Sequence, residues 1–154
     1  MLGIALLALV PTIGVAQPSS LPGTWRLEEA VTTGANPAKA VNPEGFVTFG
    51  KTYYVLIHVE PAEPRQLLPP LKTPGKPTDA EKVQAADHWA PLITQAGTYE
   101  VMGTTLTLRP IVAKTQPFTQ LYTAQLRFEG NTLWTTVKLN DGRSESRRRY
   151  TRVE

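Results

Sequence analysis

The sequence predicts an all-β protein, an antiparallel up-and-down β-barrel of about eight strands with one helix (about 78–93) between the third and fourth strands. Gly23-Thr24-Trp25 opens the first strand-like segment. In residues 96–153, apolar and polar residues then alternate as in consecutive short strands that are separated by turn residues. The last of these strands carries arginines and ends on Tyr150-Thr151-Arg152-Val153. Eight strands is the number at which a closed barrel is just wide enough for one small ligand.

The first sixteen residues resemble a signal peptide. Leu2–Val10 is an apolar run too short to span a bilayer, which takes about 20 residues. Gly14-Val15-Ala16 supplies the small residues of a signal-peptidase site, with Gln17 as the new N-terminus. We therefore expect a leader at 1–16, one domain at 17–154, a periplasmic or secreted location and no stable membrane insertion. A buried N-terminal helix is the alternative interpretation.

The first predicted strand covers 21–33. Strict alternation would place Trp25, Leu27 and Glu29 on one face and Ala30 on the other. A loop rich in Asn and Pro follows at 34–43.

The next two predicted strands, 46–49 and 53–60, flank the turn residues Gly50-Lys51. The second of them is apolar on both faces, so we expect one face on the core and the other beneath a lid or helix. Tyr54 and His58 share a face of this strand and are candidate ligand-binding residues.

Residues 61–77 contain six prolines and cannot form a regular element, because each proline removes a backbone donor. Thr78 and Glu81 match a capping box that begins a helix. Pro91 should end or kink this helix near Ala90. The apolar residues of the helix predict that it packs against one end of the barrel with Trp89 at the contact; its apolar stripe comprises Val83, Ala86, Trp89, Ala90 and Ile93.

Five strands are predicted after the helix, at 97–102, 104–112, 120–129, 132–139 and 145–153. Turn residues separate them at Gly103, Gly130-Asn131 and Asp141-Gly142.

Composition excludes several classes of protein. The 154 residues suit one domain, and the chain has no cysteine, which excludes disulfides and thiolate metal sites. The net charge of +3 is mildly basic, but the sequence lacks the long basic face with interleaved aromatic residues that is typical of a nucleic-acid interface. Two histidines, His58 and His88, do not make a metal site, and no catalytic or phosphate-binding motif occurs. We therefore expect no nucleic acid, metal or cofactor, and we favour a protein that is not an enzyme.

Three segments resemble the bacterial lipocalin-like domain family: Gly23-Thr24-Trp25-Arg26-Leu27, the helix ahead of Ala96-Gly97-Thr98-Tyr99-Glu100-Val101, and the Tyr150-Thr151-Arg152-Val153 ending. The resemblance covers most of the chain from Leu21 and implies a small β-barrel with an interior cavity. It also implies that Trp25 closes the bottom of the barrel against an arginine of the last strand, either Arg148 or Arg152. The long Pro-rich loop departs from the family pattern.

Arg148 and Tyr150 share a strand face and resemble the carboxylate-binding pair of fatty-acid-binding barrels. A guanidinium takes a carboxylate in two parallel hydrogen bonds, and a phenol adds a third. The alternative is a row of solvated arginines flanking one packed tyrosine. Arg109 is a second candidate anion contact if its strand face points inward, and a solvated residue if it points outward.

Two functional hypotheses follow. The first is an exported, non-catalytic barrel that binds a small apolar or amphipathic molecule. If Arg148 or Tyr150 points inward, the barrel would favour an anionic ligand. The second is an interaction, inhibitor or scaffold protein whose barrel is filled by its own side chains and which acts through loops or a sheet edge. The volume and lining of the interior separate them. The sequence does not indicate the oligomeric state.

Overall fold

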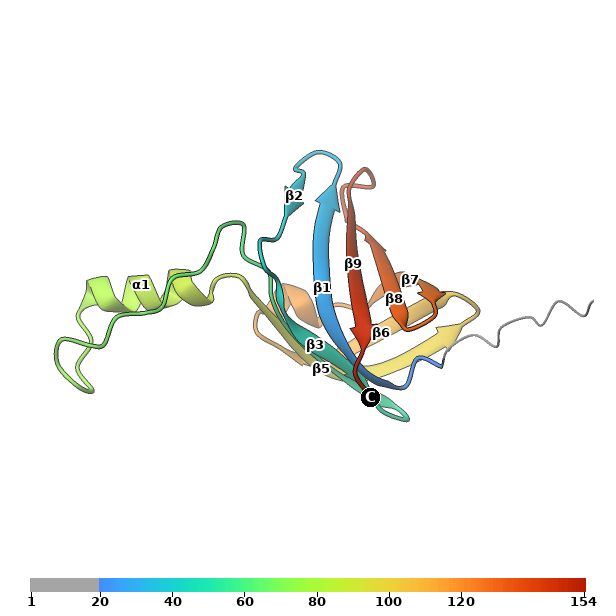
Figure 1. Cartoon of the computed structure of the whole chain (residues 1–154), viewed down its shortest axis with the longest axis horizontal. Coiled ribbons are helices and arrows are strands. Elements are labelled where there is room, and N and C mark those ends of the chain that lie inside the picture. The colour runs from blue at the N-terminus through green and yellow to red at the C-terminus, as the bar shows by residue number, and fades with distance from the viewer. Residues whose placement is uncertain (1–19) are drawn as a thin grey trace, which may run out of the picture.

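The computed structural model describes residues 20–154, so the predicted leader lies outside the described residues. The chain forms a closed, eight-stranded antiparallel β-barrel with one helix (Figure 1). Each strand pairs with the next along the chain, apart from the short β2, and β1 pairs with β9 to close the barrel. The elements are β1 Gly23–Thr33, β2 Ala38–Lys39, β3 Glu44–Phe49, β4 Tyr53–Val59, α1 Asp79–Trp89, β5 Leu92–Met102, β6 Thr105–Ala113, the 3-10 helix η1 Gln116–Thr119, β7 Tyr122–Glu129, β8 Thr132–Lys138 and β9 Glu145–Arg152.

The core fills the end of the barrel where the chain enters and leaves. Alternate residues of a strand point to one face, so the apolar positions of several strands converge inside. The buried apolar residues are Leu21, Trp25, Leu27, Ala30, Val47, Phe49, Tyr54, Leu56, Leu106, Leu108, Ala124, Leu126, Leu133 and Tyr150.

Trp25 closes this end of the barrel. Its ring is fully buried, and its indole Nε1 donates to the Leu21 carbonyl at 2.8 Å. The Arg152 guanidinium lies 4.4 Å from the ring centroid, so Arg152, rather than Arg148, is the arginine over Trp25. Arg152 also donates to the carbonyls of Ser20 and Pro22, which fixes the entering chain against the last strand.

The helix lies between β4 and β5, so its predicted place between the third and fourth strands is wrong. Four strands precede it because the predicted loop at 34–43 contains β2, which pairs with β1 through Val31↔Lys39. A two-residue strand is too short to give an alternation signal. The predicted capping box at Thr78 is confirmed, but the helix ends at Trp89, and Leu92 and Ile93 belong to β5 instead.

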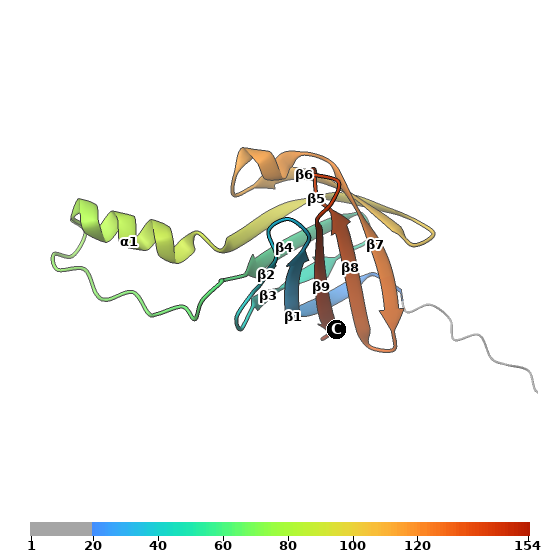
Figure 2. The same cartoon turned by 90° about the horizontal axis from the view of Figure 1, so that it is seen from above.

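The predicted packing of the helix on the barrel is also wrong. Figures 1 and 2 show α1 and the Pro-rich segment extending away from the barrel as an arm, residues 62–90. No residue of α1 is buried, and Trp89 is 48% exposed. Trp89 instead contacts other arm residues, with the Arg65 guanidinium 5.1 Å from its ring centroid. The outer face of β4 was expected to lie beneath a lid or helix, but no part of residues 20–154 covers it, and Tyr53 and Val55 are exposed.

A β-bulge in β1 reverses the predicted faces of two residues. The pairing of β1 with β9 shifts register between Leu27 and Glu29. A bulge inserts one extra residue, so the alternation resumes on the opposite face. Ala30 is therefore buried, whereas Glu29 lies on the outer face, with its Oε2 atom 3.9 Å from Arg149 Nη2.

No helix in residues 20–154 is long and apolar enough to cross a membrane.

Candidate functional site

The barrel holds a cavity of about 410 Å³ that opens at the end opposite Trp25. Its walls combine apolar side chains from β4, β5, β7 and β8 with polar ones from β5, β8 and β9. The lining residues are Leu56, Ile93, Gln95, Phe118, Gln120, Leu121, Tyr122, Val137, Lys138, Leu139, Asn140, Ser146 and Arg148. Ligand cavities of proteins typically fall between about 300 and 1,000 Å³ and are mostly apolar with a few placed polar groups.

The mouth exists because two neighbouring strands stop pairing. The ladder between β6 and β7 ends at Leu108↔Tyr122, although β6 continues to Ala113 along β5. The chain between them turns through η1, which begins after Thr115 with proline in its first turn. Phe118 and Leu121 of this connection are exposed and form part of the rim.

An ion pair lies within the barrel beside the cavity. The Arg148 Nε and Nη2 atoms donate to the two carboxylate oxygens of Glu60 at 2.6 and 3.0 Å. Their side chains are only 17% and 13% exposed. His58 is fully buried next to this pair, with Nδ1 at 3.3 Å from Glu60 Oε1, a close polar contact that is not aligned as a hydrogen bond.

The surroundings set the charge of each member of this cluster. Burial opposes ionisation of Glu60, but the neighbouring His58 and the Arg148 charge outweigh it and bring the pKa of Glu60 to about 2. Burial lowers the pKa of His58, so this imidazole is neutral near pH 7. Burial also raises the pKa of the Tyr150 hydroxyl, which stays protonated. The cluster therefore has no net charge: Glu60 and Arg148 compensate each other, and the neighbouring His58 and Tyr150 rings are uncharged.

Gln95 and Tyr122 supply uncharged hydrogen-bonding groups to the cavity. Gln95 Nε2 donates to the Tyr122 hydroxyl oxygen across the wall. The Gln95 side chain is buried, and no donor among residues 20–154 reaches its Oε1 atom. Burial raises the pKa of Tyr122, so its hydroxyl keeps a proton to donate. Buried polar groups are usually hydrogen-bonded, which marks Oε1 as an unused acceptor.

The cavity has a short extension toward Trp25. Its volume is about 30 Å³, and its wall shares Leu56, Tyr122, Val137 and Arg148 with the cavity. A space of this size holds about one water molecule. A bound molecule would therefore stay in the outer part of the barrel.

The structure places the five candidate residues in three different settings. Arg148 lines the cavity, and Tyr150 is buried beneath it, lining the extension. Tyr54 and His58 face inward and are fully buried, but neither lines the cavity or its extension. Arg109 points outward, 48% exposed, with Nη1 at 3.3 Å from Glu100 Oε2. Whether any of them binds a ligand stays a prediction.

Sequence reasoning missed Glu60, Gln95 and Tyr122. The alternation of β4 was a usable signal for Glu60, because residues 58 and 60 lie on one face. Tyr122 likewise alternates with the buried Ala124 and Leu126. Gln95 gave no such signal, because it lies between the predicted helix, which ends at 93, and the strand predicted from 97.

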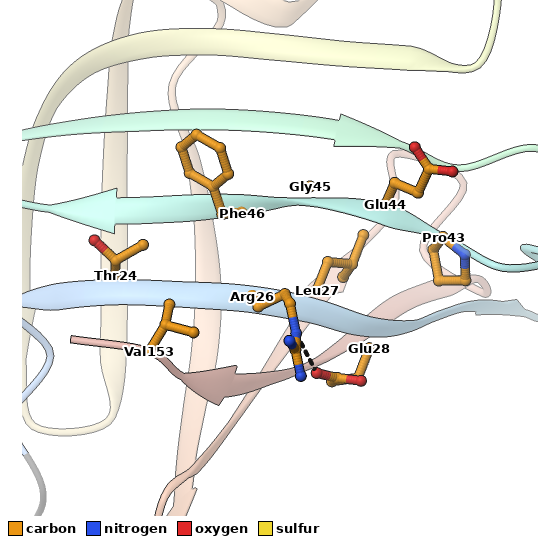
Figure 3. Close-up of a pocket in the computed structure, with 9 residues that line it drawn as sticks. All are labelled: Thr24, Arg26, Leu27, Glu28, Pro43, Glu44, Gly45, Phe46 and Val153. Carbon is orange, nitrogen blue, oxygen red and sulfur yellow. Dashed lines mark hydrogen bonds and ion pairs between the residues drawn. The ribbon is translucent and has the colours of Figure 1, made fainter.

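A second, larger hollow lies on the outside of the barrel. This groove has a volume of about 510 Å³ and lies over β1 and β3, with Phe46 and Val153 among its lining (Figure 3). Two of its charged residues pair with each other, since Arg26 Nε donates to Glu28 Oε1 at 2.9 Å. Arg26 is largely in water, and the groove contains no buried polar atom without a partner among residues 20–154. The interior cavity is the better candidate site.

Within residues 20–154, no group of three or more acidic or histidine residues is placed to hold a metal ion. No known family model matches the chain, and no curated protein matches it. Among solved structures, the chain is similar to a de novo designed, fluorescence-activating β-barrel, with a TM-score of 0.40 and 14% identity. That match covers 86% of this chain and 93% of the designed one.

Proposed function

We propose that this protein binds a small apolar or amphipathic molecule inside its barrel. The observation that carries the proposal is the 410 Å³ cavity, whose wall includes the Gln95 side chain, and the Oε1 atom of this side chain is a buried acceptor without a donor among residues 20–154. Burial of ligand carbon contributes about 25 cal/mol per Å² before the cost of association. The polar groups of the wall would orient the head group.

Membership of the lipocalin-like family is part of this proposal. The stacking of Arg152 on the buried Trp25 supports it, because this is the closure that the resemblance implies. Gly23 of the same motif has φ +133°, a conformation open to glycine, and an added Cβ would strike the C-terminal residue.

Export to the periplasm or medium is also proposed, on the strength of the apolar run Leu2–Val10 and the small residues before Gln17. The intact mass of the protein recovered from the periplasm tests it. A chain beginning at or near Gln17 is expected, and a product that retains Met1 would contradict export with cleavage.

The binding proposal is tested with a neutral apolar dye such as Nile red. We expect the dye to gain fluorescence with the parent protein and to lose affinity at least about tenfold in Val137→Trp, which fills the cavity. Thr136→Trp is the matched control, because adjacent residues of a strand point to opposite faces. Equal dye binding by both variants, or none by the parent protein, would refute interior binding.

The exposed apolar residues of the arm support a second candidate function, in which the protein acts on a partner through this segment. Leu67 is 96% exposed, and Val83 and Trp89 are also exposed on the arm. Replacement of residues 63–89 by a short Gly-Ser linker separates the two functions. Interior binding of the dye should persist in this variant, whereas an activity of the arm would be lost.

A further inference from the structure

We propose that the cavity takes an amphiphile with an uncharged head group that carries both a hydrogen-bond donor and an acceptor, such as a carboxamide, rather than a carboxylate. This inference rests on the proposed function, because it concerns the ligand of the same cavity.

The first argument is that the guanidinium of Arg148 is already taken. Two of its nitrogen atoms donate to the two oxygens of Glu60, which is the geometry that a carboxylate ligand would need. A second carboxylate at this point would meet the negative charge of Glu60 in a region of low dielectric, where like charges repel strongly. Lys138 also lines the cavity, but it is exposed at the rim, where water screens its charge.

The second argument is the uncharged pair on the wall. Gln95 Oε1 offers an acceptor without a donor among residues 20–154, and the Tyr122 hydroxyl offers a proton. The hydrogen bond from Gln95 to Tyr122 holds the two groups side by side. Rotation of the Gln95 amide by half a turn would exchange donor and acceptor but leave the pair uncharged.

An amide head group matches this pair. Its N–H would donate to Gln95 Oε1, and its carbonyl would accept from the Tyr122 hydroxyl. A carboxylate has no N–H, so it would set a negative oxygen against the Gln95 acceptor. The tail would lie against Leu56, Ile93 and Val137, which line the rest of the wall.

The test compares octanamide with octanoate, two probes that share a tail and differ in the head group. Their affinities are measured at neutral pH by displacement of Nile red and by calorimetry. We expect octanamide to bind at least about tenfold more tightly. Equal binding of the two, or tighter binding of octanoate, would overturn the inference while leaving interior binding intact if the dye still binds.

Variants then assign the preference to residues. Gln95→Met keeps the approximate volume and removes both amide atoms, so octanamide should bind about tenfold more weakly, as expected for the loss of hydrogen bonds. Nile red should be unaffected. Gln125→Met is the control, because Gln125 is exposed on the outer face of β7. An equal loss of octanamide and octanoate affinity in Gln95→Met would contradict recognition by this pair.

A gain of binding provides the sharpest outcome. Glu60→Gln removes the negative charge and frees the Arg148 guanidinium, so octanoate should bind at least about tenfold better than to the parent protein. Unchanged octanoate affinity in the folded variant would overturn the role given to Glu60. If this variant does not fold, the comparison of Gln95→Met with Gln125→Met decides the inference. Failure of the dye and both octyl probes to bind the parent protein would refute the proposed function itself.

Discussion

Arg148 of β9 binds Glu60, which follows β4, through two hydrogen bonds of 2.6 and 3.0 Å across the barrel. The two residues are separated by 88 positions in the chain, and both side chains are mostly withdrawn from water. Removing a charge from water is costly unless a partner compensates it. The pair therefore links opposite walls of the barrel and neutralises the interior beside the cavity.

Breaking this pair from one side should destabilise the fold. Arg148→Met leaves Glu60 without its partner, and we expect the free energy of unfolding to fall by about 3 kcal/mol. The double variant E60L/R148M should recover most of this loss, because it replaces the pair with apolar side chains. Urea unfolding of the parent protein, Arg148→Met, Glu60→Leu and the double variant measures the coupling. A double variant whose loss equals the sum of the single losses would show that the two residues act independently.

Stability should fall in acid in two stages. His58 has a lowered pKa in the fold, so it contributes stability that is lost as the pH drops below its unfolded value of 6.5. Glu60 has its pKa lowered from 4.5 to about 2, so its contribution is complete above 4.5 and is lost as the pH falls toward 2. This second contribution is about 3 kcal/mol. Denaturant unfolding between pH 8 and pH 2 should show both stages, and Glu60→Gln should flatten only the lower one.

The closure by Trp25 should depend on Arg152. Arg152→Met removes the guanidinium from the indole face and its hydrogen bonds to the carbonyls of Ser20 and Pro22. We expect a loss of about 1–2 kcal/mol in the free energy of unfolding. Arg109→Met is the matched control, because its exposed pair with Glu100 should contribute under about 0.5 kcal/mol. Similar losses in both variants would assign no special role to Arg152.

The arm should be dispensable for the stability of the barrel. The Glu60 amide donates to the Pro91 carbonyl at 3.1 Å, so the two ends of the arm already lie together. A Gly-Ser linker in place of residues 63–89 should change the free energy of unfolding by less than about 1 kcal/mol, since closing a shorter loop costs little entropy. Trp89→Ala in the full chain should cost less than about 0.5 kcal/mol. Thermal unfolding followed by circular dichroism checks both variants, and a large loss in either would mean that the arm supports the barrel.

Several features of the barrel were predictable because they depend on local signals. The strands around Gly130 and Asp141-Gly142 follow from alternation and turn residues, and the start of α1 follows from the Thr78 capping box. Alternation along β9 also predicted that Arg148 and Tyr150 share a face, although it left open which face points inward. The partial burial of Arg148 and the burial of Tyr150 answer that question.

Other features depend on contacts between distant segments, which local patterns do not record. The bulge in β1 arises from its pairing with β9, and it alone decides that Ala30 rather than Glu29 is buried. The arm projects because α1 buries no residue, although its apolar positions resembled a packing stripe.

The sequence by itself determined an eight-stranded antiparallel barrel, because strand alternation and turns depend on neighbouring residues; the closure by Trp25 was implied only by the family resemblance. Only the tertiary structure decided what the interior offers to a ligand. Glu60 meets Arg148, and Gln95 meets Tyr122, across strands that are far apart in the chain. Whether buried charges and polar groups compensate each other depends on the distances between residues that are far apart in the sequence, and local sequence patterns do not give these distances.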